Sequence, residues 1–454
     1  MTKSTASFAS ALLLAGLLPA CGSTTQSTPP DNDAATGGDD AQVDSGAPDA
    51  PPVDAGPDVD NGMPSTNYPA PHPPLPQLVN QAGGKTLATP KVYLIFYPGY
   101  PHEMPLQTLA QQIGANPYWA AATAEYGVGA MQYAGMIELT GETPPISISD
   151  QQIDMYMNGK IASGAFGTPD TSVVYTIYYP KTTTITLGSG GFGGGTSCQS
   201  FGGYHTDTAV TVGTAAPKNY AYAVLPTCAS FAGMGELDGL TGATSHEWIE
   251  ASTDPFPSTN GGADSAYSGV DSDHFIWAVL GGQEDGDLCV QETNAFFKPS
   301  GLDFTVQRCW SNQLAKASHD PCAPDLTGVP FFDSAPVLNE NVSFTSQFIG
   351  GTVNTKGVKI PVGQTKTVEV DLFSDAATSG PWSVEVLDVI ARYTMAAPTL
   401  AFKWDRTSGL NGEKLHLDIT VKATQTAFGG AHPFIIVSRL GGVTNTWPGL
   451  VVEQ

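Results

Sequence analysis

The chain has 454 residues, of which 18 are Lys or Arg and 43 are Asp or Glu, so its formal net charge is -25. A protein this anionic repels nucleic-acid phosphates, which excludes nucleic-acid binding, and it attracts cations such as divalent metals. The length allows two or three domains, and 51 Gly with 36 Pro indicate a chain rich in loops and strands.

Residues 1–20 are typical of an export signal. A single lysine precedes an apolar run from Phe8 to Leu18, which is too short to cross a bilayer. The tetrapeptide Leu-Pro-Ala-Cys ending at Cys21 resembles a bacterial lipobox, and acylation of Cys21 would anchor the protein to a membrane. We therefore predict a lipid-anchored protein of the bacterial outer membrane or cell surface. The alternative is a simple cleaved signal and a secreted protein.

The segment 21–76 is predicted to be a disordered tether. Residues 22–76 contain nine Asp, no Lys or Arg, many Pro, Gly and Ser, and almost no large apolar side chains. Such a composition cannot bury enough surface to offset the entropy lost on ordering.

A mixed α/β domain is expected over residues 77–325. It opens with the apolar run Pro90–Tyr100, which is typical of a strand buried on both faces. Helical patterns follow up to Gly114 and again, after Asn116 and Pro117, as far as Ala124. Further buried strands are expected over residues 171–180 and 219–226, before a helix that ends near Pro255.

That helix carries the sequence TSHEWIEASTDP, which contains most of the HExxH motif of zinc proteases. His246 and Glu250 are four residues apart and share one helix face, with Glu247 beside them. We expect His246 and Glu250 to bind a metal, with a carboxylate in place of the second imidazole, and Glu247 to act as the catalytic base.

The same helix has an ordinary interpretation. Asp238 resembles its N-cap, and Pro255 forbids its continuation beyond that point. In this alternative Leu240, Trp248 and Ala251 face the core of the domain, and the acidic side chains lie in solvent.

A second acidic segment, GGQEDGDLCVQ over Gly281–Gln291, follows at the distance where some zinc peptidases place a third ligand. We expect Glu284 to be that ligand and Asp287 to be an additional ligand or a neighbour of one. Carboxylate-rich turns also bind Ca²⁺, so Zn²⁺ is the expected ion and Ca²⁺ the alternative. His205 is a further candidate ligand or proton shuttle, against the simpler interpretation of a surface histidine, and His274 is a weaker candidate.

Other catalytic and nucleotide motifs are not supported. GSGGFGG over Gly188–Gly194 matches GxGxxG, but no helical pattern and no suitably placed acidic residue follow it. The GGKT of Gly83–Thr86 lacks the earlier glycine of a phosphate-binding loop, because Val79 is in its place. No GxSxG elbow indicates a serine hydrolase. We therefore exclude nucleotide binding.

The C-terminal segment 330–454 has a different pattern. Polar and apolar side chains alternate with period two in four stretches, most regularly in the one around Leu415, Leu417 and Ile419. Several such strands separated by Gly, Pro and Asn turns predict an all-β sandwich of immunoglobulin-like size. A structural spacer is the expected role of this domain.

Five cysteines remain when Cys21 is set aside, and an exported chain is expected to use them in two disulfides and one free thiol. The favoured pairing joins Cys198 to Cys228 and Cys289 to either Cys322 or Cys309.

Three segments resemble one known family when they are taken in order. YAYAVLPTC, DGLTGATSHEWIEASTDP and EDGDLC look like the phosphate-induced protein or EXORDIUM-like family, and the resemblance covers residues 90–322. It implies a zincin-like His-Glu helix and an acidic turn, without an assigned activity for the family. The residues that match the motifs are His246, Glu247, Glu250, Glu284, Asp287 and Cys289. Trp248 replaces a small aliphatic residue of the pattern, and Asp285 replaces an isoleucine.

Two hypotheses follow. The first is a surface-tethered zinc metallohydrolase, most simply a peptidase, in which Glu247 takes a proton from metal-activated water. The second is a non-catalytic envelope or matrix protein that binds extracellular protein or glycan and holds a structural Ca²⁺ or Zn²⁺.

Overall fold

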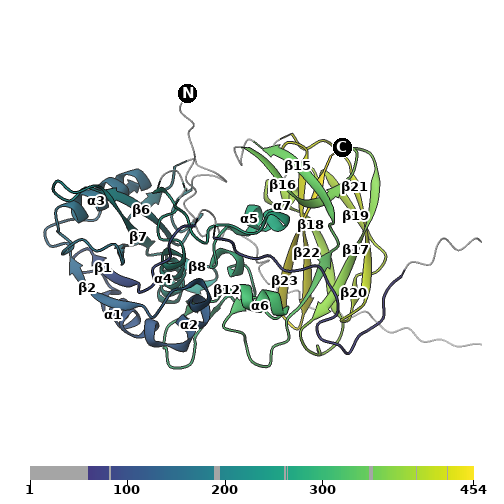
Figure 1. Ribbon diagram of the computed structural model, residues 1–454, viewed down its shortest axis with the longest axis horizontal. Coiled ribbons are helices and arrows are strands. Elements are labelled where there is room, and N and C mark those ends of the chain that lie inside the picture. Colours follow the sequence, from purple (N-terminus) through teal and green to yellow (C-terminus); the bar gives the residue numbers. More distant parts are fainter. Residues whose placement is uncertain are drawn as a thin grey trace, which may run out of the picture.

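The computed structural model describes residues 60–80, 83–188, 195–259, 262, 264–346, 351–394, 396–426 and 428–453. The predicted signal, Cys21, the first part of the tether and most of the Gly188–Gly194 loop lie outside these ranges. Figure 1 shows two lobes side by side, a mixed α/β lobe followed by a β lobe that contains the C-terminus. The structure is therefore mixed α/β with many strands, as the sequence predicts.

The first lobe is organised around a five-stranded sheet of order β2-β1-β4-β7-β6. The first four strands of that order are parallel, and β6 is an antiparallel edge strand paired with β7. The strands are β1 (Lys91–Phe96), β2 (Gln132–Glu138), β4 (Val173–Tyr179), β6 (Tyr204–Val210) and β7 (Lys218–Pro226). The three buried strands expected from the sequence are β1, β4 and β7.

Side chains alternate along each strand, so both faces of this sheet present apolar side chains. Helices cover both of these faces. Leu94 and Phe96 of β1 join a core with α1 (Glu103–Gln112), α2 (Pro117–Thr123) and α4 (Glu236–Thr253). Ile95 points the other way and joins a core with α3 (Asp150–Ala162). The sheet is thus the middle of three layers.

Helix α4 carries the HExxE segment and is buried from Gly239 to Thr253. Trp248 anchors it to the sheet, since its indole Nε1 donates to Thr176 Oγ1 of β4 at 2.8 Å. The helix begins earlier than the sequence suggests, with Gly235 rather than Asp238 at the N-cap. Asp238 lies in the first turn instead, where its carboxylate accepts from Thr305 Oγ1 at 2.7 Å.

The second lobe is a β-sandwich whose two sheets share one hydrophobic core. The four-stranded sheet has the order β14-β17-β21-β19, and the six-stranded sheet has the order β15-β16-β23-β22-β18-β20. The strands are β14 (Phe332–Pro336), β15 (Glu340–Ser346), β16 (Gly351–Lys359), β17 (Thr365–Ser374), β18 (Trp382–Asp388), β19 (Leu400–Trp404), β20 (Ser408–Gly409), β21 (Lys414–Val421), β22 (Ala431–Leu440) and β23 (Val443–Val452). Leu415, Leu417 and Ile419 of β21 are all fully buried, as their period-two pattern predicts.

Residues 60–76, which the sequence assigns to the tether, lie against the sandwich. Asn411 holds this strap through its side chain, which donates to Asn67 O at 2.8 Å and accepts from Ala70 N at 3.0 Å. The ring of His72 stacks on Phe373 with centroids 3.5 Å apart. The prediction of a disordered tether is therefore wrong for residues 60–76. Specific hydrogen bonds and one aromatic stack hold this segment against the sandwich, although its sequence has no hydrophobic pattern.

The two lobes meet at an aromatic cluster around Trp277 of α5 (Phe275–Gly281). The Trp277 ring lies 5.8 Å from Trp310 of the first lobe and 5.3 Å from Trp447 of β23, both edge to face. Edge-to-face pairs at this spacing are favourable beyond the area they bury. The lobes therefore share a packed junction.

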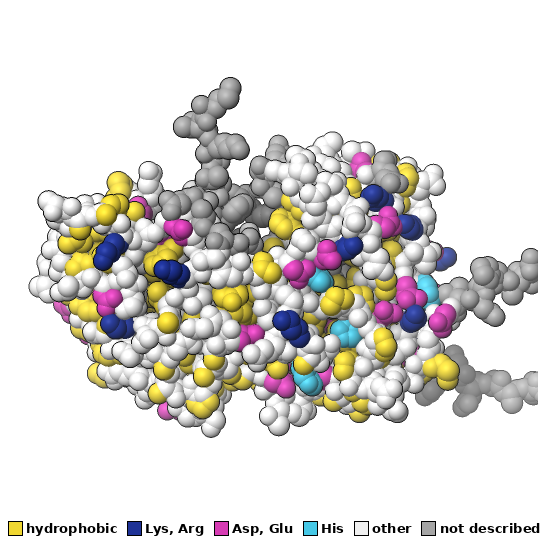
Figure 2. Space-filling model, in the orientation of Figure 1, with side chains coloured by type: hydrophobic (Ala, Val, Ile, Leu, Met, Phe, Trp, Pro, Cys, Tyr) yellow, Lys and Arg dark blue, Asp and Glu magenta, His cyan; other side chains and the backbone are white. Residues whose placement is uncertain are grey.

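Two disulfides are present, joining Cys198 to Cys228 and Cys289 to Cys322, and Cys309 is a buried free thiol. Small groups of charged side chains of both signs are scattered over the face shown in Figure 2, and no single-sign patch dominates it. None of the helices in the described ranges has the length and apolar character needed to cross a bilayer.

Candidate metal centre

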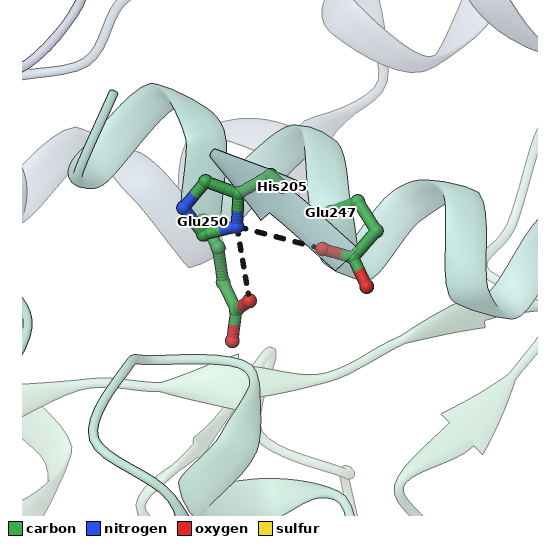
Figure 3. A group of neighbouring side chains, drawn as sticks. All are labelled: His205, Glu247 and Glu250. Carbon is green, nitrogen blue, oxygen red and sulfur yellow. Dashed lines mark ion pairs between the residues drawn. The ribbon is translucent and has the colours of Figure 1, made fainter. Parts of the chain in front are cut away.

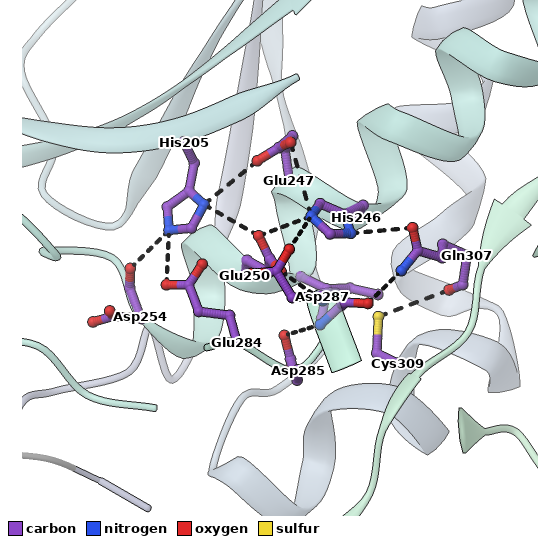
Figure 4. A network of polar contacts seen from close by, with 12 residues as sticks. His205, His246, Glu247, Glu250, Asp254, Glu284, Asp285, Asp287, Gln307 and Cys309 are labelled. Atoms are coloured by element: carbon purple, nitrogen blue, oxygen red, sulfur yellow. Dashed lines mark hydrogen bonds and ion pairs between the residues drawn. The ribbon is translucent and has the colours of Figure 1, made fainter. Parts of the chain in front are cut away.

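Two histidines and several carboxylates converge between α4, β6 and the loop after α5 (Figure 4). His246, Glu247 and Glu250 come from α4, and His205 comes from β6. The acidic loop supplies Glu284 and Asp287. Each of these six residues is at most 4% exposed. The alternative in which the acidic side chains of α4 lie in solvent is therefore wrong.

The tautomer of His246 is fixed by Gln307. The amide Nε2 of Gln307 donates to Gly286 O at 2.6 Å, so its Oε1 faces His246 Nδ1 as an acceptor at 3.1 Å. In the neutral ring His246 Nδ1 therefore carries the proton and Nε2 has the lone pair. A hydrogen-bond acceptor at the nitrogen that faces away from the metal is the usual way in which a metal-binding histidine is oriented.

The free nitrogen of His246 points at two carboxylates. Its Nε2 lies 3.0 Å from Glu250 Oε2 and 3.8 Å from Asp287 Oδ1. These three ligand atoms form one compact group, all within 4.8 Å of one another. Bonds of about 2.0 to 2.2 Å from one ion produce ligand separations of this size, so the group fits a metal such as zinc.

Backbone amides orient both carboxylates of this group. Glu250 Oε1 accepts from Asp287 N at 3.1 Å, and Asp287 Oδ2 accepts from Gln283 N at 3.2 Å. The other oxygen of each carboxylate is thereby turned toward His246. Neither His246 Nε2 nor Glu250 Oε2 forms a well-directed hydrogen bond within the described part of the chain.

Two glycines leave room for this arrangement. A Cβ at Gly286 would lie 2.5 Å from His246 Nδ1 and 2.9 Å from Glu250 Oε1. A Cβ at Gly203 would lie 2.8 Å from Glu247 Oε1. Any larger residue at either position would displace a side chain of the cluster.

A second group lies next to the first and shares Glu250 with it (Figure 3). His205 Nδ1 is 3.5 Å from Glu247 Oε2 and 3.6 Å from Glu250 Oε2. His205 is fully buried on the edge strand, so the interpretation of a surface histidine is wrong.

Glu284 is placed differently from the sequence expectation. Its Oε1 faces His205 Nε2 at 3.6 Å, and it belongs to neither compact group. Asp287 takes the position beside His246 and Glu250 that was expected for Glu284. Asp254 also reaches this cluster, because its backbone carbonyl accepts from His205 Nε2 at 3.2 Å.

Burial and mutual repulsion control protonation in the cluster. Burial lowers the pKa of His246, but Glu250 and Glu247 outweigh it and raise that pKa to about 10. Burial raises the pKa of Asp285 to about 8, and it also raises the pKa values of Glu284 and Asp287 well above their usual range. Without a metal, His246 and several of the acidic side chains therefore keep their protons. A bound cation would supply positive charge in place of these protons.

Of two further neighbours of the centre, Gln307 had no signal in the sequence, whereas Asp285 belongs to the acidic turn that the sequence indicated. Gln307 follows His246 by 61 residues and belongs to no motif, although it fixes the orientation of that ring. Asp285 is fully buried, and its Oδ1 accepts from Gly286 N at 3.0 Å. His274 lies outside the cluster, where its Nδ1 pairs with Asp271 Oδ1 at 2.8 Å.

Comparison with known proteins adds little to this geometry. No family model and no curated protein matches the chain. The chain resembles surface layer protein SbsC, domains 4-9, at 16% identity over 26% of its own length and 14% of that structure, with a TM-score of 0.16. It resembles domains 5-6 of the S-layer protein SbsC at 16% identity over 26% of its own length and 45% of that chain, with the same TM-score of 0.16.

A chimeric titin Z1Z2 structure matches at 11% identity over 27% of this chain and 97% of that one, with a TM-score of 0.16. The chain thus spans well under half of the first SbsC structure. Likenesses at these TM-scores support no argument about function.

Proposed function

We propose that the protein is an extracellular zinc metallohydrolase, most simply a peptidase. Its metal ligands are His246, Glu250 and Asp287, and its general base is Glu247. The observation that carries the proposal is the orientation of His246, whose proton is fixed on Nδ1 by Gln307 while Nε2 faces two carboxylate oxygens. A lone pair that faces buried carboxylates is unfavourable unless a proton or a cation lies between them.

The donor set favours zinc over calcium. Calcium prefers six to eight oxygen ligands, whereas imidazole nitrogen is a preferred ligand of zinc and other late first-row metals. One nitrogen and two carboxylate oxygens leave a coordination position open, which is the pattern of catalytic rather than structural zinc sites.

Glu247 is the carboxylate best placed to move a proton. Its Oε1 lies 3.9 Å from His246 Nε2, and neither of its oxygens makes a hydrogen bond within the described part of the chain. A bound zinc ion supplies Lewis acidity that lowers the pKa of a coordinated water to about 7. With such an ion bound, Glu247 would accept a proton from the water and would return it to the leaving amine.

The Glu247→Gln variant tests this assignment. Zinc content at one equivalent should match that of the wild type, and hydrolysis of denatured casein at neutral pH should fall by about 100-fold or more. A Gln151→Glu variant on the exposed start of α3 controls for a simple change of charge. Full hydrolytic activity in Glu247→Gln with zinc still bound would remove Glu247 from the mechanism.

The burial of the centre supports a second candidate function. Because His246, Glu247 and Glu250 are 0% exposed, a zinc ion here could instead stabilise an envelope or matrix protein of the EXORDIUM-like type that binds protein or glycan. In that case removal of zinc lowers the melting temperature, and no hydrolysis is detected with the metal bound.

Anchoring at the bacterial cell surface through Cys21 is part of the same proposal. The two disulfides support it, since such bonds persist in oxidising compartments outside the cytosol. Metabolic labelling with radioactive palmitate should modify the wild-type protein and not the Cys21→Ala variant, which should appear in the medium. Equal labelling of both would place the lipid elsewhere.

A further inference from the structure

His205 is oriented as firmly as His246, but from the opposite side of the cluster. Its Nε2 donates to the backbone carbonyl of Asp254 at 3.2 Å, and a backbone carbonyl can only accept. In the neutral ring the lone pair is therefore on Nδ1, which is turned toward α4. Strand β6 thus presents a second imidazole nitrogen in the form that binds a metal.

The atoms that face this nitrogen are carboxylate oxygens, one of which, Glu250 Oε2, also faces His246. Glu247 Oε2 lies 3.5 Å from His205 Nδ1, and Glu250 Oε2 lies 3.6 Å from it. All three side chains are fully buried. Neither His205 Nδ1 nor any of the oxygens facing it makes a well-directed hydrogen bond among the described residues. Separations of this size again fit bonds of about 2.0 to 2.2 Å to one ion.

The two glutamates of α4 link the two imidazoles. Glu250 Oε2 lies 3.0 Å from His246 Nε2 and 3.6 Å from His205 Nδ1. Glu247 approaches His205 with Oε2 and His246 with Oε1, the latter at 3.9 Å. Carboxylates shared between two sets of ligands are the usual construction of two-metal sites, in which the ions lie about 3.5 to 4 Å apart.

Charge in the cluster favours more than one cation. Six acidic side chains lie around the two histidines, and within the described part of the chain none of the ion pairs that join them involves a Lys or Arg; the six are Glu247, Glu250, Asp254, Glu284, Asp285 and Asp287. One divalent ion compensates for only two of these carboxylates when they are ionised. Buried carboxylates that lack a counter-charge are costly, so the cluster gains from a second ion.

We propose that His205, Glu247 and Glu250 bind a second divalent cation of the zinc class, and that this ion is inhibitory. It shares Glu250 with the first ion and is repelled by it, so its affinity is lower. Because it binds Glu247 Oε2, it removes the base from the reaction. The inhibitory part rests on the proposed hydrolytic function, whereas the binding of a second ion does not.

A zinc-binding isotherm tests the binding. The full exported chain is stripped of metal, dialysed against buffered zinc and analysed for bound metal. We expect two equivalents in the wild type, the second at least tenfold weaker. His205→Gln should bind one equivalent, whereas His274→Gln, which changes a histidine outside the cluster, should bind two. One equivalent in the wild type, unchanged in His205→Gln, would overturn the second site and leave the first intact.

A second variant covers the case in which His205→Gln does not fold. Gly203→Ala places a Cβ 2.8 Å from Glu247 Oε1 and 3.0 Å from both Glu247 Cγ and Leu225 Cδ1, so it displaces this carboxylate, and none of these three nearest atoms belongs to His246. It should lose the weaker equivalent only. A wild-type protein that binds no zinc at all would instead refute the proposed function itself.

Activity provides an independent measurement if hydrolysis is found. Raising zinc from one equivalent to saturation of the weaker site should reduce casein hydrolysis at least tenfold in the wild type. The same titration should produce less than a twofold reduction in His205→Gln. Equal inhibition of both proteins would place the inhibitory ion elsewhere.

Discussion

The hydrogen bond between Gln307 and His246 provides a sharp test of how the centre is built. The variant Gln307→Met keeps the length and volume of the side chain and removes the acceptor that fixes the imidazole tautomer. Nδ1 of His246 then lacks its acceptor at 3.1 Å, and the carbonyl of Gly286 loses its donor at 2.6 Å. The ring becomes free to rotate or to place its proton on the metal-facing nitrogen.

Loss of such a supporting contact lowers metal affinity by about 10- to 100-fold in known sites. This range corresponds to about 1.4 to 2.8 kcal/mol of binding free energy. The assay is competition for zinc against a chromophoric chelator, with Gln111→Met on the exposed face of α1 as the matched control. Wild-type zinc affinity in Gln307→Met, with Gln111→Met also unchanged, would refute the orientation of His246 on which the metal centre depends.

Other predictions concern the glycine at the site, the sandwich and the junction. Gly286→Ala places a Cβ 2.5 Å from His246 Nδ1, so zinc binding should be lost, whereas Gly159→Ala, which meets nothing within 4 Å, should bind zinc normally. Burial raises the pKa of Asp333 from 3.8 to about 7, so folding favours its protonated form and stability falls as pH rises through that window. Calorimetry should show Asp333→Asn gaining about 4 kcal/mol relative to the wild type between about pH 4 and about pH 8; a constant difference would contradict this. Trp277→Ala should destabilise the protein by about 3 to 5 kcal/mol and speed proteolysis between the lobes, and an unchanged cleavage rate would show that the junction does not depend on this ring.

Continuous apolar stretches predicted the buried strands well. β1, β4 and β7 correspond to such stretches because strands buried on both faces need apolar side chains at nearly every position. Strand β6 was not predicted, since YHTDTAV contains polar residues at most positions. Its polar side chains are accommodated by the cluster and by partners such as Ser258, which donates to Asp207 Oδ1. Tertiary contacts therefore decide the conformation of this segment.

The part of the candidate site on α4 could be predicted because helical spacing alone places His246, Glu247 and Glu250 together. The third proposed ligand could not be predicted, because three acidic residues lie within four positions of the loop after α5. Only the backbone path of this loop decides which of the three faces α4. That path passes Gly282 with φ of +106° and brings Asp287, not Glu284, to His246. His205 and Gln307 are distant in sequence, and no local pattern connects either of them to the helix.

The most direct test of the account is an anomalous X-ray difference map recorded at the zinc edge from crystals of the full exported chain grown with one equivalent of zinc. A zinc ion in the proposed site gives one strong peak within bonding distance of His246 Nε2, Glu250 Oε2 and Asp287 Oδ1. A fully occupied peak elsewhere, or no peak at the cluster with zinc in excess, would contradict it.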